Sequence, residues 1–204
     1  MVAPSAERFE AALRNAEEFF MGDAKVQRAL TALAKSLDEI GVPYAIAGAM
    51  ALNAYGYERV TTDVDVILTR EGLAKLKEAK LGLGYVEKFP GSHGLRDTEN
   101  NVEIDVLIAG EFPGDGKPKP IAFPDPTTAL RVGAHRIVSL PKLVELKLAS
   151  GMTAPHRLKD LADVLELIRA VHLTEDFGQK LDPYVQSKYG DLWRAAQSHD
   201  PEEG

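Results

Sequence analysis

The 204-residue chain contains no cysteine, which excludes disulfide bonds and thiolate metal sites. This composition fits a reducing compartment, so we expect a cytoplasmic protein. Long hydrophobic runs are also missing, since no segment approaches the roughly 18–20 apolar residues that a membrane span requires. The first 15 residues are too polar for a secretory signal. We therefore expect no membrane among the partners.

Positive charge is in short supply. The chain has 24 Lys and Arg against 31 Asp and Glu, which gives a formal net charge of −7. An acidic chain lacks the overall attraction that nucleic-acid binding uses, so a polyanionic substrate needs a local basic patch or a metal ion. Carboxylates are the main ligands available for such an ion, and these hard ligands favour Mg²⁺ or Mn²⁺. The densest basic patch comprises Arg131, His135, Arg136 and Lys142.

Hydrophobic periodicity predicts strands and helices mixed through two thirds of the chain, followed by helices alone. We expect strands over residues 44–47, 63–68, 85–89, 102–108 and 136–139, and helices over residues 5–20, 25–40, 49–55, 71–81, 140–150, 156–171 and 184–197. Residues 91–101 are polar, and residues 110–126 are rich in Pro and Gly, so both stretches are predicted as loops. The pattern favours an α/β or α+β fold. We expect N-terminal helices over residues 1–40, a core over 41–139 and a helical part over 140–204.

Asp63 and Asp65 are the first candidates for chemistry. Successive strand side chains alternate between faces, so these two carboxylates project from the same face, about 7 Å apart along the strand. Like charges so placed repel each other, and a divalent cation would remove that penalty. The alternative is an ordinary solvent-facing strand edge, because Asp-x-Asp is a common tripeptide.

Three neighbouring features favour the metal site. Asp105 shares a face with Glu103 on the strand over 102–108, so adjacent strands would bring three carboxylates together, a ligand set for two metal ions. Gly48 follows a strand and opens a helix, a turn whose N–H groups can bind an anion. Arg59 precedes the aspartates in the sequence. It could contact a phosphate, hold the carboxylates in place through an ion pair, or remain a solvated loop cation.

The segment AGAMALNAYGYERVTTDVDVIL resembles the G-[GS]…R-x-T-x-D-x-D segment of the polymerase-beta-like nucleotidyltransferase superfamily. It is most similar to the bacterial abortive-infection and type IV toxin–antitoxin nucleotidyltransferase toxins. The resemblance implies a mixed-sheet core flanked by helices, magnesium, and transfer of a nucleotidyl group from a nucleoside triphosphate (NTP) with release of pyrophosphate.

The resemblance also implies roles for individual residues. Asp63, Asp65 and Asp105 would bind the metal ions and act in catalysis. The residues implied for nucleotide binding are Gly48, Ala49, Arg59, Thr62 and Lys147. Ala49 departs from the pattern, since the family usually has Gly or Ser there. The backbone N–H is kept at that position, and a serine hydroxyl is lost.

A second block, from Leu140 to Asp163, resembles the K…R-x-K-D-x-x-D helical segment of the same toxin-like branch. Lys147 and Asp160 each share a helical stripe with apolar residues, at the edge of a buried face where an unpaired charge is costly. The resemblance implies that Lys147 contacts the phosphates and that Asp160 orients it or the acceptor. The alternative is a structural ion pair that joins two helices.

We therefore expect a magnesium- or manganese-dependent nucleotidyltransferase that acts on an RNA 3′ end, a protein or a small molecule, with an antitoxin protein as an implied partner. A non-catalytic binding protein and a metal-dependent phosphohydrolase are the alternatives. His93, Lys117 and Lys119 are weaker substrate-contact candidates, for which solvent exposure is the default. Trp193 is most simply a core or interface residue. The sequence has no Walker-type loop and no Ser–His–Asp order.

Overall fold

The computed structural model describes residues 25–198 of the chain. These residues form a seven-stranded sheet with the order β3-β4-β5-β2-β1-β7-β6. The strands are β1 (Ala45–Ile46), β2 (Asp63–Leu68), β3 (Tyr85–Glu87), β4 (Leu95–Asp97), β5 (Val102–Ile108), β6 (Leu130–Val132) and β7 (His135–Ile137). β2 runs parallel to β5 and antiparallel to β1, while β1 and β7 are parallel. The sheet is therefore mixed, which confirms the predicted fold class.

The two central strands owe their position to alternating side chains. Val64 and Val66 of β2 are buried, whereas Asp63 and Asp65 are partly exposed. β5 repeats the pattern over its whole length, with every second residue buried from Val102 to Ile108. Each strand thus places apolar side chains on one face, and its acidic side chains lie on the other face together with Ile67 or Leu107.

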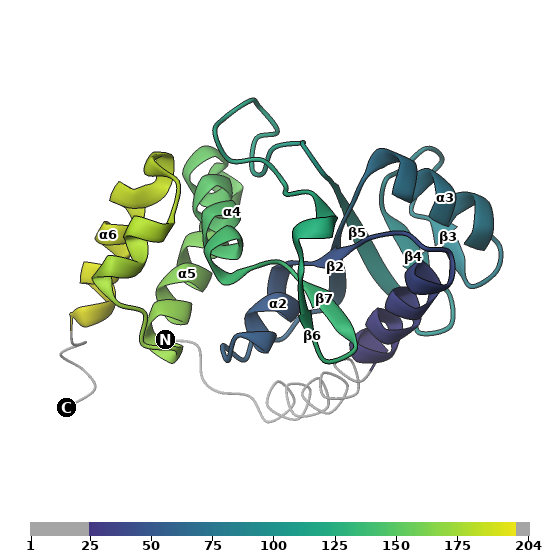
Figure 1. The fold of residues 1–204 in the computed structure, drawn as a ribbon, viewed down its shortest axis with the longest axis horizontal. Helices are drawn as coiled ribbons and strands as arrows, with labels where there is room; N and C mark the ends of the chain where they lie inside the picture. Colours follow the sequence, from purple (N-terminus) through teal and green to yellow (C-terminus); the bar gives the residue numbers. More distant parts are fainter. Residues whose placement is uncertain (1–24, 199–204) are drawn as a thin grey trace, which may run out of the picture.

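Helices lie on both sides of the central strands. Figure 1 shows the helix over residues 25–39 and α3 (Arg70–Lys80) on one side, and α4 (Leu140–Thr153), α5 (Leu158–Ala170) and α6 (Pro183–Gln197) on the other. The first two are joined by an ion pair between Lys80 and Glu39, 2.9 Å apart. The short helix α2 (Gly48–Ala54) directly follows β1.

The C-terminal helices begin where the sequence signals suggest. Pro141 occupies the first turn of α4, where its missing N–H costs nothing. Asp182 caps α6 by accepting a hydrogen bond from the Tyr184 N–H. Buried residues of α4, α5 and α6 belong to the same hydrophobic core as the sheet. The predicted division of the chain into three parts, with boundaries at residues 40 and 139, remains a prediction.

Two short strands differ from the sequence-based expectation. β4 lies within residues 91–101, which we predicted as a loop, and β6 was not predicted at all. Three residues carry too little alternation to be recognised, and these strands form through pairing with β3, β5 and β7. Leu95, the apolar residue of that polar stretch, is fully buried. The predicted helix over 5–20 lies outside the described residues.

The predicted long loop is confirmed, because no helix or strand forms between Gly110 and the short 3-10 helix η1 (Pro126–Thr128). Within residues 25–198, no helix is both long enough and apolar enough to cross a membrane.

Candidate functional site

The predicted acidic residues lie on the two neighbouring strands at the centre of the sheet. Asp65 of β2 lies directly opposite Asp105 of β5, and Asp63 lies opposite Glu103. The carboxylates face a cavity of about 600 Å³. Residues from the sheet, the Pro/Gly-rich loop and the C-terminal helices line it, among them Gly48, Ala49, Arg59, Thr61, Thr62, Asp63, Asp65, Asp105, Phe112, Phe123, Lys147, Ser150, His156, Arg157, Lys159 and Asp160.

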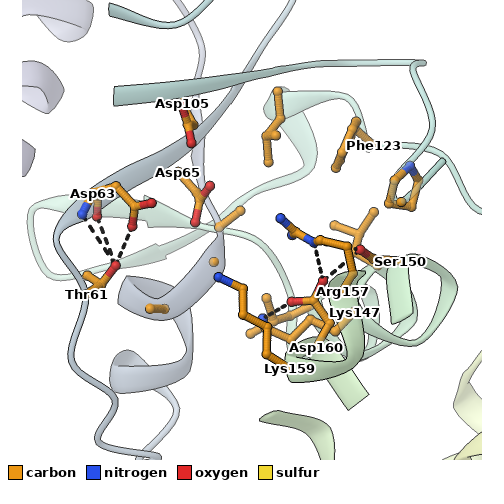
Figure 2. Close-up of a pocket in the computed structure, with 18 of the residues that line it drawn as sticks. Thr61, Asp63, Asp65, Asp105, Phe123, Lys147, Ser150, Arg157, Lys159 and Asp160 are labelled. Carbon is orange, nitrogen blue, oxygen red and sulfur yellow. Dashed lines mark hydrogen bonds and ion pairs between the residues drawn. The ribbon is translucent and has the colours of Figure 1, made fainter. Parts of the chain in front are cut away.

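The three carboxylates are held separately in this arrangement. The Asp63 carboxylate accepts a hydrogen bond from the Thr61 hydroxyl, as Figure 2 shows. Asp105 accepts one from the Lys88 ammonium at 3.0 Å. Among residues 25–198, no three acidic or histidine side chains are gathered closely enough to hold a metal ion as they stand. The expected adjacency of the two strands is correct, but the expected convergence of the three carboxylates needs a correction.

The correction has a physical reason. Carboxylates without a cation between them repel, so Asp63 and Asp105 turn to local donors. The strand positions still suit a magnesium or manganese ion, because three hard oxygen donors project from one face of two paired strands.

Asp65 is the carboxylate that has no compensating partner. The side-chain carboxylate of Asp65 accepts no hydrogen bond from residues 25–198, in contrast to the carboxylates of Asp63 and Asp105. Burial raises its pKa to about 6, and the negative charges of Asp63 and Asp105 add to the rise. Lys147 and Arg157 act in the opposite direction on the pKa. A carboxylate in this state is stabilised by any cation that enters the cavity.

Gly48 fixes the position of Asp65. The chain leaves β1 at Ala47, whose N–H donates to the Asp65 carbonyl at 3.0 Å. It then turns at Gly48, with φ of +58°, and a Cβ there would lie 1.7 Å from the Asp65 Oδ2. Only glycine combines this backbone conformation with this approach. The predicted Gly48 turn therefore lies at the carboxylates.

A wall of charged side chains from the C-terminal helices faces the carboxylates across the cavity (Figure 2). The Lys147 ammonium of α4 donates to Asp160 at 3.1 Å and to Asp163 at 2.7 Å, both on α5. Asp160 also accepts from the Ser150 hydroxyl at 2.7 Å and from Arg157 at 2.8 Å. The ion pair between Lys147 and Asp160 is the alternative that the sequence left open, and the sequence did not indicate that Asp163 shares the lysine. The contact of Lys147 with phosphates remains a prediction.

The cations of this wall outweigh the effect of burial on Asp160. Burial raises the pKa of Asp160. Lys147, the Ser150 hydroxyl and Arg157 together lower this pKa by more than burial raises it, so that the net shift is downward. Arg59 joins the network from the loop before β2 and donates to Asp163 at 2.9 Å. The structure shows Arg59 in an ion pair with a carboxylate of α5, so it does not hold a metal-site carboxylate in place. Its contact with a phosphate remains a prediction.

The fold of the chain is shared with a solved structure of an antibiotic-resistance factor. The solution structure of the antibiotic-resistance factor ANT(2'')-Ia matches it with a TM-score of 0.52 at 15% identity, over 89% of this chain and 100% of that chain. A crystal structure of ANT(2'')-Ia in complex with adenylyl-2''-tobramycin matches with a TM-score of 0.49 at 14% identity, over 84% and 99%. No protein-family model matches the sequence, and no curated protein does. At these identities the likeness concerns the fold.

The remaining candidates separate into two groups. Thr62 and Ala49 line the cavity, Thr62 as an exposed residue and Ala49 as a buried one. His93, Lys117 and Lys119 do not line it. Lys119 is instead occupied by Asp115 and the Pro113 carbonyl, both at 2.6 Å, and so holds the Pro/Gly-rich loop in shape. Trp193 donates to the Leu173 carbonyl at 3.0 Å and packs against the core.

Sequence reasoning missed several lining residues of the cavity wall. Ser150 faces the cavity from α4, Arg157 from the short 3-10 helix η2 (Pro155–Arg157) and Lys159 from the first turn of α5. Their signal was present, because Arg157 and Lys159 belong to the same block as Asp160. Phe112 and Phe123 come from the loop over 110–126, which carries no periodicity from which their direction could be predicted.

Proposed function

We propose that the protein is a divalent-metal-dependent nucleotidyltransferase, which transfers a nucleoside monophosphate group from an NTP to an acceptor hydroxyl. The observation that carries the proposal is the juxtaposition in one cavity of in-register Asp65 and Asp105, the Gly48 turn against Asp65, and a cationic wall opposite. The carboxylates suit cations, and the wall suits a polyphosphate. The nucleotidyltransferase fold supports this combination.

In the proposed reaction, an acceptor oxygen attacks the α-phosphorus of the NTP. One bond forms between that oxygen and phosphorus, the α–β phosphoanhydride bond breaks, and pyrophosphate leaves. Asp105 accepts the proton of the acceptor hydroxyl. Asp63, Asp65 and Asp105 are the residues that would hold a magnesium or manganese ion, which would supply a lowered pKa of the hydroxyl and neutralisation of phosphate charge. The wall that includes Lys147 and Arg59 offsets the remaining negative charge.

The acceptor is the finer part of the proposal. The ANT(2'')-Ia crystal structure contains an adenylylated small molecule, adenylyl-2''-tobramycin. For this chain, the basic patch that an RNA acceptor would need is partly neutralised, since Arg136 pairs with Asp38 and Lys142 with Glu145. We therefore propose a hydroxyl of a small molecule or protein as the acceptor rather than RNA.

The decisive experiment incubates the protein with each NTP labelled at the α-phosphate, Mg²⁺ or Mn²⁺, and separate fractions of RNA, protein and small molecules. We expect transfer of label to one fraction with release of pyrophosphate, and loss of transfer in Asp65→Asn. Inorganic phosphate from a γ-labelled NTP would instead indicate a phosphohydrolase. Transfer that persists in Asp65→Asn and Asp63→Ala would refute the site.

The resemblance to toxin nucleotidyltransferases adds a biological role to the proposal. A toxin of this kind should arrest growth when expressed, and a partner antitoxin should relieve the arrest. Expression of the wild-type chain beside Asp65→Asn tests this role, because growth arrest by both chains would not arise from transfer chemistry.

A further inference from the structure

Four basic side chains of the cavity wall differ in how much of their charge is already neutralised. Arg59, Lys147, Arg157 and Lys159 all line the cavity. A triphosphate brings several negative charges. The groups best placed to bind it are cations whose charge is not already neutralised by a carboxylate. The ion pairs of the wall therefore indicate which side chain takes this role.

Three of the four cations are engaged. Lys147 is held between Asp160 and Asp163, and its side chain is only 7% exposed. Arg59 pairs with Asp163 and Arg157 with Asp160. These three cations share two carboxylates, so the network retains one net positive charge. To reach a phosphate, Lys147 would have to leave two carboxylates that are both nearly buried.

Lys159 is different. It lies in the first turn of α5 and forms no ion pair within residues 25–198. Its helical neighbour at i+4 is Asp163, an ordinary partner for a lysine on a helix. That carboxylate is already taken by Lys147 and Arg59. Figure 2 shows the Lys159 side chain extending from α5 into the cavity, toward the side that carries Asp63 and Asp65.

We propose that Lys159 is the side chain that directly contacts the polyphosphate of the incoming NTP. The inference deepens the proposed function and rests on it. The carboxylates Asp160 and Asp163 leave Lys159 unpaired by binding the other three cations. The triphosphate thereby meets an exposed, unpaired ammonium on the cavity wall, opposite the strands that carry the aspartates.

The test measures binding of magnesium tripolyphosphate by calorimetry, so that the preferred nucleobase does not matter. Lys159→Gln should weaken binding by about tenfold or more, as expected for loss of a charge-assisted contact. Lys159→Arg, which keeps the charge, should bind within a few-fold of the wild type. Lys75→Gln is the matched control, an exposed lysine on α3 that also has no ion pair in the described part of the chain, and it should bind like the wild type.

Lys159 is exposed, so Lys159→Gln should melt at the wild-type temperature, and Lys159→Ala provides a second variant. Binding by Lys159→Gln and Lys159→Ala within twofold of the wild type overturns the inference. If the wild type transfers label in the assay above while these variants bind normally, only the role of Lys159 fails. If tripolyphosphate binding depends on Lys159 and no fraction accepts label, the phosphate contact stands and the transferase proposal fails. If the wild type does neither, both fail.

Discussion

At the scale of single residues, Asp65 has the least favourable environment for a negative charge among the carboxylates of the cavity. It is surrounded by Asp63, Asp105 and the Gly48 backbone, and its raised pKa reflects burial first and like charge second. Carboxylates with strongly raised pKa values gather at functional sites. In the proposed enzyme, a bound cation would compensate for the buried negative charge.

This environment makes the difference in unfolding free energy between Asp65→Asn and the wild type dependent on pH. The folded-state pKa of about 6 lies above the ordinary 3.8. The stability contributed by the protonated form is therefore complete below about pH 4 and is lost as the pH rises through 6. Without divalent metal, Asp65→Asn should exceed the wild type by at most about 3 kcal/mol above pH 7, and the gain should vanish near pH 4. Urea unfolding across this pH range measures it, and a gain that is constant with pH would contradict the account.

Gly48 gives a second prediction at the same scale. Gly48→Ala should destabilise the protein by about 2 kcal/mol or more, because the new methyl group overlaps the Asp65 carboxylate at a positive φ. Gly82→Ala is the matched control, since Gly82 also has a positive φ but has open space around it. Its cost should be near 1 kcal/mol. Equal costs for the two variants, measured by urea unfolding, would show that contact with Asp65 is unimportant.

At the scale of elements, the buried ion-pair network joins α4, α5 and the loop before β2. Lys147 belongs to α4, Asp160 and Asp163 belong to α5, and Arg59 belongs to the loop. Arg59 lies four residues before Asp63, so the network also anchors the segment that leads into the acidic strand. The helical C-terminal part therefore contributes one wall of the cavity and helps to position the opposite one.

Removal of one carboxylate from this network should be costly. Asp163→Ala leaves Lys147 with a single partner in a nearly buried position, and we expect a loss of about 3 kcal/mol in unfolding free energy. Glu166→Ala is the control on the same helix, because Glu166 forms an exposed pair with Arg169 at 3.0 Å and should cost less than about 1 kcal/mol. Chemical denaturation of both variants makes the comparison, and similar losses would mean that Lys147 finds other compensation.

At the scale of the whole molecule, a central parallel pair of strands supplies carboxylates and the C-terminal helices supply cations. The cavity lies between these two groups, so it carries opposite charges on its two sides. Such an arrangement suits a metal-bound polyphosphate, which presents cations to one side and anionic oxygens to the other. The overall charge of −7 is therefore no obstacle to binding a polyanion.

The molecule should accordingly be stabilised by NTP only when a divalent ion is present. At a ligand concentration of 100 times the Kd, the gain is about 2.7 kcal/mol, which is visible as a rise in Tm. The rise should disappear on addition of EDTA and in Asp63→Ala. Thermal shift with each of the four NTPs would also reveal the base preference, and stabilisation that is independent of metal would argue for a binding protein without the proposed site.

The sequence by itself determined which side chains share a face, because alternation within 63–68 and 102–108 is a local property of a strand. It also placed Lys147 and Asp160 at the margin of buried helical faces, and the structure shows the ion pair that the sequence left open as an alternative. The glycine at position 48 was recognisable as a turn for similar local reasons. The roles of these residues in catalysis and binding remain proposals.

Only the tertiary structure decided which residues meet. The alignment of Asp65 with Asp105 depends on the pairing of strands 40 positions apart, which no local pattern encodes. The same holds for the partners of each charge: Thr61 for Asp63, Lys88 for Asp105, and Asp163 for both Lys147 and Arg59. Charged side chains choose partners by distance and burial, so the distinction between an engaged Lys147 and an unpaired Lys159 appears only once the chain is folded.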